Sequence, residues 1–302
     1  MIRSVAVPKS SRVPSISLAV AWFGVYLGGT VAYAQAFADR STTLQYTADA
    51  GLWFGWVAVV MTLLLPGTIS LTVIRMIVPA SVPTAVAALV WGHADAGPGA
   101  VAVTAGCVAT AVAYSAEFGR SMIQASAYGD ERRFPLRPPG ALVLGPLPLL
   151  WLVAMVPLAV GPLLIADHRF FAGVGLSVVG GAFTTVMFLR SHLLARRWLV
   201  FVPAGLVLHD HVPIAETAMI PAGQVVGLDL AAANLAAADT TATDLTAAAF
   251  GPAVEIRLRA PLLIAVRGVG RAAASSAAST TALLVSPSRP GTVIAEARRR
   301  GW

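Results

Sequence analysis

The first two-thirds of the chain carries its apolar residues in long runs that are separated by short polar stretches. A helical run of about 20 apolar residues rises ~30 Å, which is the thickness of the hydrocarbon core of a bilayer. We predict six membrane-spanning helices of this kind, at residues 16–36, 53–74, 78–92, 99–116, 141–166 and 170–189. The predicted fold class is an α-helical multi-pass membrane domain, residues 1–195, followed by a small β-rich domain, residues 196–302.

The shortest run, residues 78–92, contains two prolines and is either a third span or a re-entrant segment. The loop at residues 117–138 contains four arginines, and it would lie outside the cytoplasm if the run did not cross. Because cytoplasmic loops carry the excess of Lys and Arg, the charges favour a crossing helix. We therefore expect a plasma (inner) membrane protein with its N- and C-termini in the cytoplasm.

The second predicted span contains Pro66-Gly67, where a proline is expected to kink the helix. Arg75 is expected at the membrane boundary where this span ends, because an arginine at the centre of a span costs at least ~2.5–3.5 kcal/mol. Away from their ends, the predicted spans contain no ionisable residue of the kind that marks proton-coupled transporters. The prolines of the second and fifth spans leave open a substrate site formed by broken helices.

The first apolar run is preceded by basic residues and ends near Ala32-Tyr33-Ala34, which resembles a signal-peptidase site. Cleavage after Ala34 would remove the first span. The run at residues 16–36 is longer than the ~7–15 apolar residues of a usual signal peptide, and this length favours retention.

Small residues spaced about four apart share one face of a helix, where a second helix can approach closely. Two spans carry such a face, which we predict to be a helix-packing surface. The residues are Gly24, Gly28 and Ala32 in the first span, and Gly173, Ser177 and Gly181 in the sixth.

From Arg196 onwards the pattern changes to short alternating runs bounded by Pro and Gly. Alternation of apolar and charged residues at 253–259 is typical of a half-buried antiparallel strand. We predict seven strands, at residues 198–202, 206–210, 216–221, 224–231, 253–259, 261–267 and 281–286. Residues 232–252 are predicted to be a long connection with one helical turn, and residues 288–300 a closing helix.

Seven strands and a C-terminal helix, entered directly after a span by Arg196-Arg-Trp-Leu-Val-Phe-Val-Pro-Ala-Gly-Leu-Val-Leu208, resemble the bacterial PH-like domains. The segment Ala218-Met-Ile-Pro221 resembles the end of a hairpin in that family. The resemblance implies binding of lipids or proteins and no catalysis, and the insertion at 232–252 departs from the compact fold. The whole chain also resembles Ala/Val/Leu-rich integral membrane proteins of actinobacteria, which implies no particular activity.

Composition agrees with a membrane protein, since 57% of the residues are hydrophobic and 12% are charged, against about 25% charged in soluble domains. The net charge of +7 lies mainly where cytoplasmic loops are predicted, so we expect no nucleic-acid partner. The single cysteine, Cys107, excludes an intramolecular disulfide, a CxxC pair and a cysteine-based zinc site.

Two patterns in the second half were tested as chemical sites. Residues 268–273 match G-x-G-x-x-A, but no acid follows about 20 residues later, so a turn is favoured over a dinucleotide site. His209 and His211 flank Asp210 and share a face of a strand, but zinc needs three or four ligands and no third is evident. We therefore predict no enzyme, and no catalytic, cofactor-binding or metal-ligating residue.

Arginines and tryptophans at both ends of the β-rich domain are predicted to contact anionic headgroups at the membrane surface. These residues are Arg196, Arg197, Trp198, Arg298, Arg299, Arg300 and Trp302. The favoured function is a non-catalytic scaffold or regulatory protein, which contacts the lipid bilayer and a protein partner or a second copy of itself. The alternative is a small transporter or lipid-handling protein, for which we expect a polar cavity among the second, fifth and sixth spans.

Overall fold

The computed structural model describes residues 12–231, 242–267 and 276–302. The chain forms two compact units. The helical unit comprises Met1–Ala125 and Leu147–His192, and the β unit comprises Ser126–Pro146 and Leu193–Trp302. The predicted division at residue 195 differs from this one because the loop at 126–146 belongs to the β unit.

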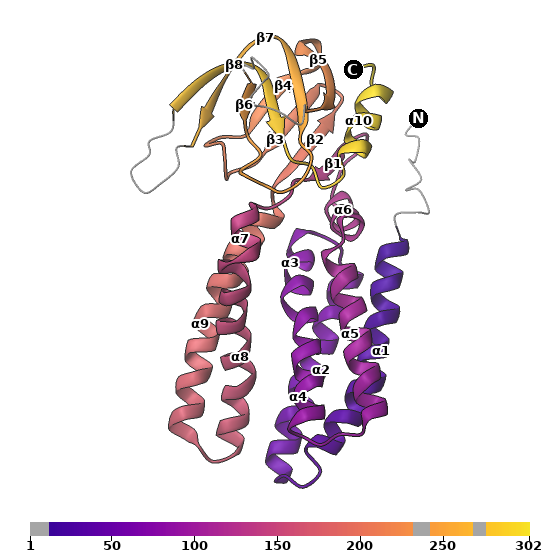
Figure 1. Cartoon of the computed structure of the whole chain (residues 1–302), viewed down its shortest axis with the longest axis vertical. Coiled ribbons are helices and arrows are strands. Elements are labelled where there is room, and N and C mark those ends of the chain that lie inside the picture. The colour runs from indigo at the N-terminus through magenta and orange to yellow at the C-terminus, as the bar shows by residue number, and fades with distance from the viewer. Residues whose placement is uncertain (1–11, 232–241, 268–275) are drawn as a thin grey trace. The chain divides into compact units, whose positions relative to one another are not determined.

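Six helices among the described residues are long and apolar enough to cross a membrane, and the prediction of six is confirmed (Figure 1). They are α1 (Val13–Ala36), α2 (Thr42–Leu64), Thr68–Val90, α5 (Ala96–Tyr114), α8 (Pro146–Ala166) and α9 (Phe170–Ala195). The third combines α3 (Thr68–Ile77), a 3-10 turn (Val78–Ala80) and α4 (Ser81–Val90). Two shorter helices, α6 (Ala116–Gln124) and α7 (Gly140–Leu144), lie before and after the central loop.

The second and third spans were predicted with the wrong boundary. Helix α2 ends at Leu64, and Pro66-Gly67 lies between two helices and not within one. The physical reason is that proline has no amide hydrogen and its ring clashes with the preceding turn, so the chain breaks here instead of bending. As a consequence Arg75 lies inside the third span, whereas it was predicted to lie at the end of the second.

The small-residue face of α1 packs directly against α5. A Cβ atom on Gly28 would lie 2.6 Å from the backbone nitrogen of Ala102 and from the carbonyl oxygen of Pro98. Gly24 is similarly close to Ala105, and Ala32 is fully buried. Only glycine allows an approach this close, and we call this contact the α1–α5 seam.

Helices α8 and α9 form a hairpin with the same kind of contact (Figure 1). A Cβ atom on Gly173 would lie 2.7 Å from the backbone nitrogen of Ile165, and Ser177 lies against Gly161. Gly181 has no atom of α8 near it, and its neighbour Gly180 makes the contact instead.

The β unit contains two four-stranded sheets. The first has the order β1-β2-β3-β4 and the second β5-β7-β8-β6, with β6 and β8 parallel and all other neighbours antiparallel. The strands are β1 (Arg132–Pro135), β2 (Trp198–Val202), β3 (Gly205–His209), β4 (Ala218–Pro221), β5 (Val225–Leu230), β6 (Ala242–Asp244), β7 (Val254–Val266) and β8 (Ser276–Val285). The predicted β-sheet region and C-terminal helix, α10 (Pro290–Arg299), are confirmed.

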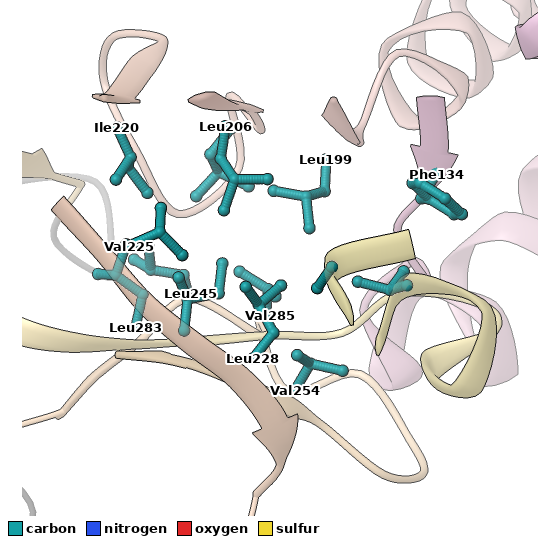
Figure 2. Packing of buried hydrophobic residues seen from close by; sticks show 14 of the residues in the cluster. Phe134, Leu199, Leu206, Ile220, Val225, Leu228, Leu245, Val254, Leu283 and Val285 are labelled. Atoms are coloured by element: carbon teal, nitrogen blue, oxygen red, sulfur yellow. The ribbon is translucent and has the colours of Figure 1, made fainter. Parts of the chain in front are cut away.

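The core of the β unit lies between the two sheets (Figure 2). Leu199, Leu206 and Ile220 of the first sheet point toward residues of the second, such as Val225 and Leu283. Alternate residues of β2 and β3 supply part of this core, namely Leu199, Phe201, Leu206 and Leu208, as the period of two requires. Buried residues of α10 complete it, namely Val293 and Ala297.

The predicted strands need three corrections. Strand β6 lies at Ala242–Asp244, within the stretch 232–252 that was predicted to be a connection. Strand β1 lies in the loop between α6 and α7, where no strand was predicted, and it pairs with β2 through Phe134 opposite Leu199. The two strands predicted at residues 253–259 and 261–267 are a single strand, β7 (Val254–Val266). An irregularity in the pairing between Arg257 and Leu262 accommodates Pro261, which cannot donate a hydrogen bond.

Candidate functional site

A cavity of about 670 Å³ opens among α1, α2, α4, α5 and α8 of the helical unit. Phe37, Phe54 and five Trp and Tyr residues contribute to its lining, and we call the cavity the aromatic groove. The Trp and Tyr residues are Trp22, Tyr26, Tyr33, Trp53 and Trp56. Most of the remaining lining is aliphatic, which makes the groove suited to an apolar molecule.

Three of these rings form a cluster between α1 and α2. The ring centroid of Tyr26 lies 5.1 Å from that of Trp56 and 5.4 Å from that of Trp53. The two indoles meet edge to face at 5.8 Å. Trp53 and Trp56 are three residues apart and therefore share one face of α2. The Nε1 of Trp22 donates a hydrogen bond to the carbonyl oxygen of Trp56 at 3.2 Å, which fixes the register of the two helices.

Some polar groups of the groove have no partner among the described residues, and two of them concern its α2 wall. The Nε1 of Trp56 is buried and has no hydrogen-bond partner among the described residues. Buried donors of this kind are normally paired, so a bound molecule or water is expected here. The side chain of Asp49 also lines the groove, is exposed, and forms no ion pair with a described residue.

This site was not predicted from the sequence, because the second span was expected to begin at residue 53, which leaves Asp49 outside it. In the structure Asp49 is the eighth residue of α2. The expectation that no ionisable residue lies within a span is therefore wrong for Asp49, and it is wrong for Arg75 as well. The spacing of Asp49, Trp53 and Trp56, four and then three residues apart, is the signal that places all three on one helical face.

Arg75 is engaged within the helical unit. Its Nε donates to the carbonyl oxygen of Ala113 at 3.1 Å, and its guanidinium carbon lies 5.5 Å from the centre of the Tyr114 ring. The hydroxyl of Tyr114 donates in return to the carbonyl oxygen of Arg75 at 2.9 Å. A cation at the C-terminal end of a helix stabilises its last carbonyl groups, so Arg75 has a structural role at the end of α5.

Arg197 is not available to the membrane surface, and this prediction is wrong. Its side chain and that of Asp210 are both fully buried. The Nε and a terminal nitrogen of Arg197 donate to the two oxygens of Asp210 at 2.7 and 2.8 Å, and the other terminal nitrogen donates to the carbonyl oxygen of Arg137 at 2.8 Å. A buried arginine requires such partners, and its position between Arg196 and Trp198 in the sequence gave no sign of them.

The other residues predicted at the membrane surface divide into two groups. Arg196, Arg298 and Arg299 are exposed. The ring of Trp198 stacks on that of His209 at 5.4 Å, and the ring of Trp302 stacks on that of Phe201 at 5.8 Å.

Arg300 belongs to the second group, because it is tied into the β unit. Its Nε donates to Glu296 at 2.8 Å, and a terminal nitrogen donates to the carbonyl oxygen of Asp130 at 2.7 Å. Arg300, Trp198 and Trp302 therefore contribute to the packing of the β unit.

The two histidines around Asp210 do not form a metal site with it. Asp210 is occupied by Arg197, and the Nδ1 of His209 lies 2.9 Å from the hydroxyl of Thr217. Burial lowers the pKa of His209 and of His211 below the ordinary value, so both rings are neutral near pH 7. Within residues 12–231, 242–267 and 276–302, no three His, Cys, Asp or Glu residues are grouped to hold a metal ion. The G-x-G-x-x-A pattern at 268–273 lies outside the described residues.

Comparisons of the chain with protein family models, with curated proteins and with solved structures found no match. The function is therefore inferred from the geometry of the two units alone.

Proposed function

We propose that this chain is a plasma (inner) membrane protein that binds a lipophilic molecule in its aromatic groove. The observation that supports this is the size of the cavity, about 670 Å³, in a unit where α1 packs closely on α5 and α8 on α9. Ligand pockets typically measure about 300–1,000 Å³ and are lined mainly by apolar and aromatic groups. A bundle with no ligand to hold is expected to close such a space, because protein interiors are normally filled.

The lining of the groove favours a lipophilic ligand over a polar solute. The alternative of a small transporter or lipid-handling protein was expected to have a polar cavity among the second, fifth and sixth spans. The groove instead involves α2 and α8 together with α1, α4 and α5, and its lining is largely aromatic and aliphatic. Within a bilayer the molecules at highest concentration are lipids, so lipid handling is the function this lining suits best.

The β unit is proposed to be a PH-like module that binds a protein partner or a second copy of the chain without catalysis. Two antiparallel-rich sheets packed face to face and closed by a C-terminal helix support this assignment. Strand β1 departs from the PH-like pattern, because it comes from the loop between two spans. Six crossings put both termini on one side, and the arginines of the loop at 117–138 favour the cytoplasmic side.

The test is photolabelling of the full-length protein in nanodiscs with a diazirine-bearing fatty alcohol. Ala159 lines the groove and is exposed, so Ala159→Trp fills the space without displacing a packed neighbour. Ala182→Trp is the control, because Ala182 is exposed on α9 and does not line the groove. We expect labelled peptides from α1 and α2, and about tenfold less labelling in Ala159→Trp, since overpacking costs ~1–3 kcal/mol. Equal labelling of the two variants would overturn the proposal.

A further inference from the structure

The position of Asp49 within the groove points to the kind of molecule that binds there. Asp49, Trp53 and Trp56 lie on one face of α2, and each step of four residues rises ~6 Å along the helix. The carboxylate is therefore one turn from the first indole and about two turns from the second. All three side chains line the same cavity.

Among the residues that the structure describes, the carboxylate of Asp49 has no cationic partner. It forms no ion pair with any residue in the described ranges, although it lies in a helix long and apolar enough to span a membrane. Arg169, a cation in the turn between α8 and α9, is already paired with Asp167 at 3.2 Å. An unpaired charge within a span is costly, and such residues usually mark a functional site.

The aromatic cluster is the second, independent feature. Tyr26, Trp53 and Trp56 lie within 5.1–5.8 Å of one another, measured between ring centroids. The faces of aromatic rings carry negative potential and attract organic cations, most strongly where water is excluded. A carboxylate beside such rings repels anionic headgroups, and it contributes nothing to the binding of an uncharged chain.

We infer that the aromatic groove binds a lipophilic ammonium, a molecule with a positively charged nitrogen and an apolar tail. This inference rests on the proposed function and names its ligand class. The ammonium group lies beside Asp49 and the indole of Trp53. The tail occupies the apolar part of the groove near Trp22, Ile77 and Met155. A Cβ atom on Gly55 would lie 3.7 Å from the side chain of Ile77, which places this part of the groove at the level of Trp56.

The experiment compares two probes of equal chain length, dodecyltrimethylammonium and dodecanol, as competitors of the photolabel on full-length protein in nanodiscs. In the wild type we expect dodecyltrimethylammonium to compete with the photolabel more strongly than dodecanol does. Asp49→Asn should weaken competition by dodecyltrimethylammonium about tenfold or more, as expected for loss of a charged partner. Competition by dodecanol should not change. Asp49→Glu should retain the preference. Asp39→Asn is the control, because Asp39 is an acid of the α1–α2 loop that does not line the groove.

The outcomes separate the inference from the proposed function. Equal competition by both probes in the wild type, or an unchanged preference in Asp49→Asn, overturns the cation site and leaves the apolar ligand site standing. Competition by neither probe counts against both.

Nanodiscs with and without phosphatidylethanolamine then identify the source of the ammonium group. A loss of apparent affinity for dodecyltrimethylammonium in the ethanolamine lipid indicates that a lipid headgroup occupies the site. An unchanged affinity indicates a free lipophilic amine.

Discussion

Two carboxylates show how differently the two units hold charge. Asp210 in the β unit is fully buried, and both of its oxygens accept hydrogen bonds from Arg197. Asp49 in the helical unit is exposed beside a cavity and is paired with no described residue. The first arrangement uses charge to hold a fold together, while the second leaves charge available for a ligand.

The same contrast separates two parts of the helical unit. At the α1–α5 seam the backbones are so close that no side chain fits at Gly28. At the same level but through neighbouring residues such as Gly29, α1 also borders the aromatic groove, where about 670 Å³ is unfilled. Because one helix forms both surfaces, the groove does not result from loose packing of the whole bundle. The tight seam instead gives the groove a rigid wall, which pre-organises it for binding.

The largest expected effect is the loss of the buried ion pair in the β unit. Asp210→Asn leaves the guanidinium of Arg197 buried without its counter-charge, and breaking such a pair costs about 3–5 kcal/mol. We expect hydrogen exchange to accelerate at the amides of β2 and β3, measured on the full-length protein in detergent.

Two further variants give this prediction its control. Glu216→Gln changes an exposed acid of the same unit and should leave exchange unaltered. In the double variant Arg197→Met, Asp210→Leu, no buried charge remains, and most of the stability should return. If Asp210→Asn exchanged no faster than wild type, the pair would not stabilise the β unit as argued.

A smaller effect is expected from filling the α1–α5 seam. Gly28→Val places side-chain atoms against the backbone of α5, which cannot move aside, and overpacking of this kind costs about 1–3 kcal/mol. The midpoint of thermal unfolding of the helical unit should fall. Gly181→Val is the matched control in a helix of similar length, because no other helix lies near Gly181 and the midpoint should barely change. An equal fall of the unfolding midpoint in both variants would contradict the close packing of α1 on α5 at the seam.

The sequence predicted the elements of each unit better than their contacts. Six apolar runs of sufficient length predict six helices, since a bilayer requires that length and little else. The boundary near Pro66 was misplaced because the run is continuous on both sides of it. Strand β1 was missed because Phe134 is its one deeply buried residue and arginines precede it, a pattern with no visible alternation.

The candidate site was harder to predict because its residues meet only in the folded bundle. The pattern of α2 alone puts Asp49 and two tryptophans on one face, but nothing in it shows that Tyr26 of α1 completes the cluster. Likewise, the pairing of Arg197 with Asp210 joins adjacent strands whose register the sequence did not specify. Contacts across elements depend on register and packing, which hydrophobic runs do not encode.

The smallest expected effect concerns a carboxylate whose burial is intermediate between that of Asp210 and that of Asp49. Glu296 of α10 is mostly covered and accepts hydrogen bonds from Arg299 and Arg300. Burial raises its pKa, but the hydrogen bonds and charges of the two arginines outweigh burial, so the pKa lies below the ordinary value. A lowered pKa means that the ionised form stabilises the fold above the ordinary pKa of ~4.3, and that this stability is lost as pH falls through the lowered pKa.

Glu296→Gln should therefore destabilise the β unit by about 0.5–1 kcal/mol at pH 7, as expected for pairs near the surface. The difference from wild type should shrink as the pH falls below the ordinary pKa of ~4.3 and through the lowered pKa of Glu296, because the wild-type carboxylate is then neutralised as well. Denaturant unfolding followed by circular dichroism at several pH values measures both effects. A difference that stayed constant with pH would show that Glu296 acts through packing and not through its charge. The contrast with Asp210 would then reflect burial alone.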